Sequence, residues 1–186
     1  LKLSSDIPKF SKKEKNYFQK NLAKRIIISA VSTHKGEEEI ILNQIESLIH
    51  KKNILLIIQP RHPDRSTKII SLLKKQNLIF KQRSKKQIPN NTTEVFLFDT
   101  FGETGLLMSI SDIIILGGTL VSIGGHNLIE AAQFGKCIVV GPHVNKIEEI
   151  VNDFLKHKAI KKIKKNEQLN YLLEKLIYDK KQLKTL

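Results

Sequence analysis

Short apolar runs alternate along the chain with longer segments in which apolar and polar positions are mixed. The apolar runs are rich in β-branched residues and contain few charges, a pattern typical of strands buried on both faces of a parallel sheet. They lie at 25–31, 53–59, 94–99, 111–117 and 136–141, and a weaker run lies at 77–82. The sequence therefore predicts five central strands and a sixth, weaker one.

The segments between these runs carry the spacing of amphipathic helices. They predict helices at 37–51, 65–76, 103–110, 127–134, 146–156 and 166–178. Alternating strands and helices indicate right-handed βαβ units, and hence an α/β fold with a Rossmann-like parallel sheet flanked by helices. In such sheets ligands bind beyond the carboxyl ends of the strands, where the strand order switches. The loops that follow strands are therefore the candidate sites.

Two of these loops carry side chains that suit a nucleotide. In "PRHPDR" (60–65), the planar guanidinium of Arg61 can bind a phosphate or a carboxylate. A solvated arginine in a Pro-rich turn is the alternative. In "FDTFGETG" (98–105), Gly102 permits a tight turn and Glu103 begins a helix. An acid there is usually only a partner of the helix dipole, but it also suits hydroxyls or a base amino group.

The third loop, at 117–127, contains two glycine pairs and leads into a helix. Gly124 and Gly125 predict unpaired backbone N–H groups close to a bound anion at the helix start. The alternative is a capping box, in which Asn127 caps the helix and Glu130 occupies its third position without any ligand. The second glycine pair favours a phosphate site, because a capping box does not require it. The loop lacks the G-x-G-x-x-G pattern, so a nicotinamide cofactor is poorly supported.

The three acids of "GEEE" (36–39) begin a predicted helix, where acids are usually partners of the helix dipole. We therefore interpret them in that way. The single cysteine, Cys137, begins an apolar run and is expected to be a buried thiol rather than part of a disulfide or a metal cluster.

The length of 186 residues fits one domain, and the net charge of +14 is concentrated at its ends. Residues 1–25 carry a charge of +6 and residues 156–186 a charge of +7, whereas residues 26–155 carry only +1. Two explanations are equally open, a lysine-rich composition and an attraction to anionic surfaces. No apolar run is long enough to span a bilayer and no signal peptide pattern begins the chain, which favours the cytoplasm.

Several motifs together resemble a known family. "STHKGEEE", "PRHP", "FGE" and "GGHNLIE" occur in this order over most of residues 25–150. In this the chain resembles the C-terminal half of the lipid A 3-deoxy-D-manno-octulosonic acid (Kdo) transferases. The opening "LKL" is similar to the short "NLK" segment where that family crosses between domains. The resemblance implies an inverting glycosyltransferase of the two-Rossmann-domain (GT-B) type, with this chain as the half that binds the donor, CMP-Kdo.

The resemblance also implies roles for individual residues. Lys2 would stabilise the departing phosphate, and Glu130 would accept hydrogen bonds from the ribose hydroxyls. Gly124 and Gly125 would support the phosphate loop, while His34 and His126 would orient loops. The residues expected to line the CMP site are Pro60, Arg61, Phe101, Gly102, Glu103, Asn127, Leu128, Ile129 and Glu130. No cofactor and no metal are expected, since no D-x-D motif is present.

The same resemblance sets expectations about partners and boundaries. The family's general base belongs to an N-terminal half, so we expect no activity from this chain alone. The expected partners are CMP-Kdo, a lipid A precursor, the N-terminal half and the anionic cytoplasmic face of the bacterial inner membrane. The expected division is a linker and basic helix at 1–24, a core at 25–156 and a basic segment at 157–186.

Two alternatives remain from the sequence. The chain could be the nucleotide-sugar-binding half of another GT-B glycosyltransferase or of an epimerase, because this fold serves many functions. It could also be a basic, non-enzymatic module that binds nucleic acid. The nearly neutral centre and the aromatic content of 6% argue against nucleic acid.

Overall fold

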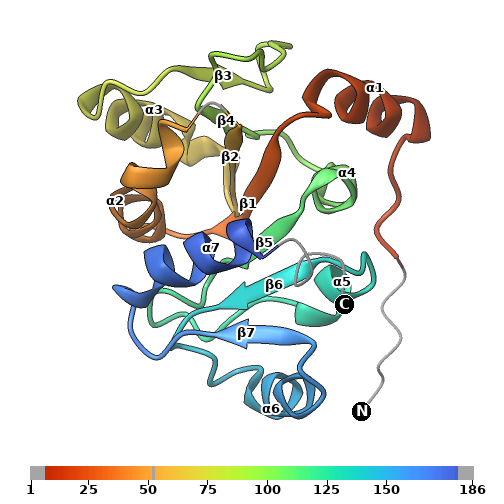
Figure 1. Cartoon of the computed structure of the whole chain (residues 1–186), viewed down its shortest axis with the longest axis vertical. Helices are drawn as coiled ribbons and strands as arrows, with labels where there is room; N and C mark the ends of the chain where they lie inside the picture. The colour runs from red at the N-terminus through yellow and green to blue at the C-terminus, as the bar shows by residue number, and fades with distance from the viewer. Residues whose placement is uncertain (1–6, 52, 180–186) are drawn as a thin grey trace.

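The computed structural model describes residues 7–51 and 53–179, which form one sheet with helices on both faces (Figure 1). The strands are all parallel and follow the order β3-β4-β2-β1-β5-β6-β7. Their bounds are β1 (Ile26–Thr33), β2 (Ile54–Pro60), β3 (Phe80–Gln82), β4 (Val95–Leu97), β5 (Ile113–Leu116), β6 (Cys137–Val140) and β7 (Ile160–Lys162). The predicted α/β, Rossmann-like fold is confirmed.

The helices divide between the two faces of the sheet. One apolar cluster packs α2, α3 and α7 against the sheet, and the other packs α1, α4, α5 and α6 against the opposite face. The helix bounds are α1 (Lys12–Leu22), α2 (Glu37–Ile49), α3 (Ser66–Lys75), α4 (Thr104–Ile110), α5 (Leu128–Ala132), α6 (Glu148–Lys156) and α7 (Gln168–Tyr178), with a 3-10 turn at Pro63–Arg65. Because helices cover both faces, the central strands are apolar on both sides, as their sequences predicted.

The order of the strands switches at β1. On one side of β1 lie β2, β4 and the edge strand β3, whereas β5, β6 and β7 extend the sheet on the other side. The loops after β1 and β5 therefore leave the sheet side by side at its carboxyl edge. In a doubly wound sheet this is the point where a ligand binds.

The C-terminal part of the chain extends the sheet further than the sequence indicated. β7 pairs with β6, and Leu169 and Leu173 of α7 are buried in the apolar cluster beside α2. The core thus continues past residue 156, its predicted boundary. The sequence pattern did not indicate β7, because two of its three residues are lysines and it lies at the edge of the sheet.

Other elements expected from the sequence are present in the structure. The weak strand predicted at 77–82 is β3, and the basic helix expected before residue 25 is α1. Cys137 is a free, buried thiol, and burial raises its pKa to about 11. No helix in the described ranges is long and apolar enough to cross a membrane.

Candidate functional site

A pocket of about 150 Å³ lies at the switch in strand order. Its walls come from the ends of β1 and β5, from the loop after β2, and from the start of α4 and α5. The lining residues are Val31, Ser32, Arg61, Thr104, Met108, Leu116, His126, Asn127 and Glu130. The fold thus brings together three residues proposed from the sequence, Arg61, Asn127 and Glu130.

The start of α5 is capped by its own side chains. The Oδ1 atom of Asn127 accepts from the backbone N–H of Ile129 at 3.1 Å and of Glu130 at 3.4 Å. The side-chain amide of Asn127 in turn donates to Oε1 of Glu130 at 2.8 Å. The return bond of a standard capping box goes to the backbone N–H of the cap residue, so this is a variant of that motif. Both side chains are thereby held at the pocket wall before any ligand binds.

The glycine pair before α5 has a different role from the one predicted. The backbone N–H groups of Gly124 and Gly125 both donate to the carbonyl of Gly118, at 3.0 and 2.8 Å, so they are not free for an anion. Both residues have positive φ angles, 101° and 96°. A Cβ atom on Gly125 would lie 2.5 Å from Ile147, and one on Gly124 would lie 2.7 Å from Lys146. The pair is therefore needed for a turn that packs closely against the loop after β6.

Two of the acids at the start of α2 anchor the neighbouring loops. Glu37 is completely buried, and its carboxylate accepts from the backbone N–H groups of His34 at 2.9 Å, Gly118 at 2.7 Å and Leu120 at 2.9 Å. Burial raises the pKa of Glu37 despite these bonds. The interpretation as a simple partner of the helix dipole is wrong for this residue, since its carboxylate joins the loop after β1 to the loop after β5.

Glu38 anchors the next pair of loops and is 1% exposed. Its carboxylate accepts two bonds from the guanidinium of Arg65, at 2.7 and 2.8 Å, and one from the hydroxyl of Thr33 at 2.7 Å. It too is more than a dipole partner, and only the third acid, Glu39, is exposed as that interpretation requires.

The loop after β4 is more exposed than the loops that Glu37 and Glu38 anchor. Phe101 is 80% exposed and Gly102 is exposed, with a φ angle of 74°. The carboxylate of Glu103 accepts from Arg83, through Nη2 and, at 3.1 Å, through Nε, and from the hydroxyl of Thr100. Burial alone would raise the pKa of Glu103, but these hydrogen bonds and the charge of Arg83 lower it. Glu103 is therefore an oriented anion at the edge of the site.

Arg83 is a partner of Glu103 that the sequence did not indicate. Besides Glu103, it pairs with Glu14 of α1 at 2.7 Å, and its guanidinium lies over the rings of Phe18 and Phe98. These bonds raise its pKa. Its position within the basic run "RSKK" gave no signal that would distinguish it from a solvated cation.

His34 and His126 contact each other across the mouth of the pocket. Their rings are nearly parallel, at 15°, with centroids 4.8 Å apart, and they meet edge to edge through Nε2 atoms that are 2.7 Å apart. Burial and the nearby charges of His34, Arg61 and Lys146 lower the pKa of His126 to about 4. The contact joins the loops after β1 and β5, and a role of the two residues in orienting these loops stays a prediction.

The remaining predicted residues occupy three kinds of position. Pro60 ends β2 and is buried, and Leu128 is also buried, so both belong to the packed interior beneath the site rather than to its surface. Ile129 is half-buried in the first turn of α5. Lys2 lies outside the described residues. In the described part of the chain, no group of three or more His, Cys, Asp or Glu residues could hold a metal ion.

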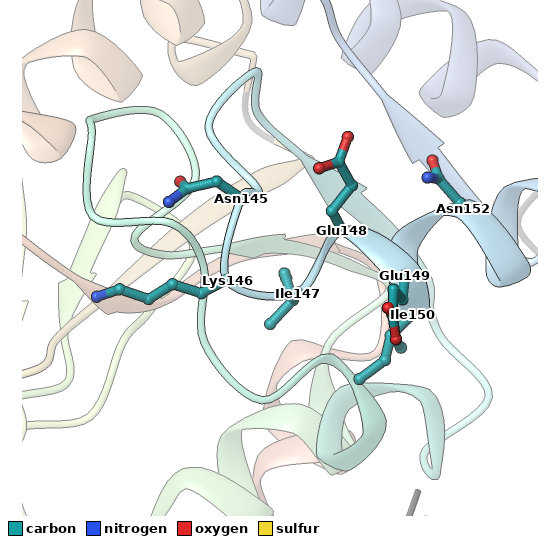
Figure 2. A pocket seen from close by; sticks show the side chains of 7 residues that line it. All are labelled: Asn145, Lys146, Ile147, Glu148, Glu149, Ile150 and Asn152. Atoms are coloured by element: carbon teal, nitrogen blue, oxygen red, sulfur yellow. The ribbon is translucent and has the colours of Figure 1, made fainter.

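A larger hollow of about 480 Å³ lies nearby, along the start of α6. It is lined by Asn145, Lys146, Ile147, Glu148, Glu149, Ile150 and Asn152. Figure 2 shows the side chain of Lys146 directed away from the carboxylates of Glu148 and Glu149. The two carboxylates at its wall would repel an anionic ligand, whereas the smaller pocket at the strand switch contains Arg61.

Comparison with known proteins agrees with this architecture. No protein-family model matches the chain. The chain is 44% identical to 3-deoxy-D-manno-octulosonic acid transferase of Haemophilus influenzae over 127 residues, which are 68% of this chain and 30% of the relative. It is 34% identical to the transferase of the same name from Rickettsia felis over 181 residues, 96% of this chain and 38% of the relative. The chain thus spans about a third of the length of these relatives.

A solved structure matches nearly the whole fold. The C-terminal CMP-Kdo binding domain of WaaA from Acinetobacter baumannii superimposes with a TM-score of 0.87 and 26% identity, covering 92% of this chain and 93% of that one. The fold is that of the C-terminal, Rossmann-like domain of a GT-B glycosyltransferase. Within that class, the chain belongs with the C-terminal half of the 3-deoxy-D-manno-octulosonic acid transferase family.

Proposed function

We propose that this chain is the donor-binding half of an inverting glycosyltransferase that transfers Kdo from CMP-Kdo to a lipid A precursor in lipopolysaccharide synthesis. The observation that carries the proposal is the convergence of Arg61, Asn127 and Glu130, from separate loops, on one pocket at the strand switch. The likeness to a domain described as binding CMP-Kdo supports this ligand.

The size of the pocket fits one half of a two-domain cleft. Its volume of about 150 Å³ is below the roughly 300–1,000 Å³ of pockets that enclose a whole small ligand. We propose that the ribose and phosphate of CMP occupy this pocket, with the base extending over the loop at 101–103. A second domain would then close over the sugar.

The polar groups suit this arrangement of the nucleotide. Arg61 supplies a cation for the phosphate, while the carboxylate of Glu130 can accept bonds from the ribose hydroxyls. Glu103 accepts three hydrogen bonds, and a carboxylate has about four acceptor positions. One position is left for a donor such as the amino group of cytosine, and the exposed ring of Phe101 lies in the same loop. Lys2 retains its proposed role at the leaving phosphate.

The proposal also requires a second half. The acids closest to the pocket are already bonded, Glu130 to Asn127 and Glu103 to Arg83, while Glu37 is buried beneath the loops. A base must take the proton of the acceptor hydroxyl during transfer. We therefore assign that base, and most of the acceptor surface, to an N-terminal half supplied in cis or in trans.

We place the working enzyme at the cytoplasmic face of the bacterial inner membrane, with the basic ends of this chain directed toward anionic lipid. The charges of +6 and +7 at the two ends support this position. A lysine-rich composition without function is the alternative account of these charges.

A transfer assay tests the proposal. The purified chain is mixed with CMP-Kdo and a lipid A precursor, either alone or with the N-terminal half of a family member. We expect no transfer by the chain alone and measurable transfer by the pair, which Arg61→Ala in this chain reduces strongly. Turnover by the chain alone would contradict the assignment of the base to the missing half.

A further inference from the structure

The mouth of the pocket is rich in nitrogen groups that have no matching anion. Loops after β1, β2, β5 and β6 bring His34, Arg61, His62, His126 and Lys146 into one neighbourhood. The rings of His34 and His62 are 6.1 Å apart, and the charges of Arg61, Lys146 and His62 all act on His126. Lys146 is directed away from the acids of α6 in Figure 2. The cluster therefore has a positive potential that a bound anion would complement.

The acids close to this cluster do not neutralise it. Glu38 is the acid that acts on His34, and its two oxygens already accept from Arg65 and Thr33. Glu130 lines the pocket and is bonded to the side chain of Asn127. Within residues 7–51 and 53–179, no carboxylate makes an ion pair with a member of the cluster.

The hydrogen bond between the two imidazoles fixes what they can offer a ligand. One Nε2 atom must donate and the other must accept, so in the neutral pair one ring carries its proton on Nδ1. One further proton makes both Nδ1 atoms donors while the bond between the Nε2 atoms is kept. His126 turns its Cδ2 and Nε2 atoms toward Gly118, and no hydrogen-bond partner of either Nδ1 atom occurs among the described residues. The pair is thus a donor site whose strength increases when it takes up a proton.

We propose that the His34–His126 pair is the subsite for the carboxylate of an ulosonic acid donor. This inference rests on the proposed function. In an activated 2-ulosonic acid the carboxylate and the phosphate ester are attached to the same carbon, so a phosphate held by Arg61 requires a carboxylate site directly beside it. His126 and Arg61 line the same pocket, which provides that adjacency. The subsite distinguishes ulosonic acids from nucleotide sugars that lack a carboxylate.

Three ligands separate this subsite from the nucleotide site. They are CMP, a non-hydrolysable CMP-ulosonic acid, and the same analogue with its carboxylate converted to a carboxamide. We expect the wild-type chain to bind the acid at least tenfold more tightly than the amide. His34→Asn and His126→Asn should abolish this preference, and they should lower the affinity for the acid at least tenfold more than the affinity for CMP. The matched control is His157→Asn, which changes an exposed histidine at the C-terminal end of α6 and should alter neither the preference nor the CMP affinity.

The pH dependence of the preference for the acid over the amide is a second test of the subsite. Lowering the pH from 8 to 6 should increase the preference for the acid in the wild-type chain, because binding of the carboxylate is coupled to proton uptake by the pair. The groups that oppose this uptake are Arg61, His62, Arg65 and Lys146, while Glu38 favours it. Both Asn variants should show no such dependence, and thermal melting checks that they remain folded.

The outcomes are distinguishable. Failure of the wild-type chain to bind CMP would contradict the proposed function itself. Binding of CMP with equal affinity for acid and amide would overturn only the carboxylate subsite, as would an acid preference that survives in both Asn variants. A parallel loss of CMP and acid affinity in the variants would also overturn it, because the pair would then shape the whole pocket.

Discussion

The two sides of the site are built in different ways. On the first, which we call the braced side, the loops at 32–36 and 117–127 are tied together by the buried carboxylate of Glu37 and by the His34–His126 contact. On the second, the open side, the loop at 98–105 presents an exposed Phe101, and Glu103 is held mainly by Arg83.

This difference indicates a division of labour. Groups fixed by buried hydrogen bonds are preorganised, so they bind a ligand without the entropic cost of ordering a loop. The braced side therefore suits the phosphate and the sugar, where the reacting carbon must be positioned closely. The open side suits the base, whose flat ring can be covered by a side chain that moves on binding.

The largest effect is expected from breaking the braced side. Glu37→Ala removes the acceptor of three backbone N–H groups. We expect the free energy of unfolding to fall by about 3 kcal/mol or more, because each buried donor left unpaired costs about 1–3 kcal/mol. Urea unfolding measures this change. The control is Glu39→Ala, an exposed acid in the same turn, which should change stability by less than about 0.5 kcal/mol. Equal effects of the two variants would show that Glu37 is only a dipole partner.

A change on the open side should affect binding more than folding. Arg83→Met releases Glu103, and we expect CMP affinity to fall about tenfold, which corresponds to ~1.4 kcal/mol. Arg83→Lys should restore part of the affinity, since it keeps the charge but not the planar guanidinium. Titration calorimetry and thermal melting together test this. Lys86→Met is the control, because Lys86 is exposed and lines the same surface hollow as Arg83 and Glu103. A large loss of stability with unchanged CMP affinity would contradict the comparison.

Glu130→Gln tests whether this carboxylate contacts the ribose of CMP or its base. We expect CMP binding to weaken about fivefold, ~1 kcal/mol, while binding of cytosine alone is unchanged, because the lost contact is to the ribose. Calorimetry with both ligands measures the difference. A lower melting temperature with unchanged CMP affinity would instead mean that Glu130 serves only to cap α5.

The smallest effect is expected for lipid binding by the basic ends of the chain, which belong to neither side of the site. If these lysines hold the protein against anionic lipid, the chain should bind acidic vesicles weakly at low salt and detach as salt is raised. Sedimentation with vesicles measures the bound fraction. Equal binding to neutral vesicles, or none to acidic ones, would favour compositional bias.

The sequence predicted the parts of the molecule whose role depends on pattern. Five strands were predicted because their residues are apolar throughout, and β3 from a weaker run. Arg61 was proposed because it follows a strand, and the resemblance to a known family implied a place for Asn127 and Glu130 in the same site. β7 was missed because an edge strand has only one neighbouring strand and tolerates its two lysines. Such an element takes its structure from tertiary pairing rather than from local pattern.

The contacts of Glu37, Glu38 and Arg83 could not be predicted from the sequence either, because they too depend on tertiary structure. Glu37, Glu38 and Glu39 are chemically alike and adjacent, yet the first two are buried and the third is exposed. Which acid is buried depends on loops more than 20 residues away along the chain, at Arg65 and Gly118. The same holds for Arg83, whose partners Glu14 and Glu103 meet only in the fold.

The central claim is that the site at the strand switch binds the cytidine nucleotide of the donor. Its most direct test is calorimetric titration of the wild-type chain with CMP and with UMP under the same conditions. We expect CMP to bind and UMP to bind at least tenfold more weakly, because the amino group of cytosine donates to Glu103 whereas the carbonyl of uracil is repelled by it. No binding of CMP, or equal or tighter binding of UMP, would contradict the account.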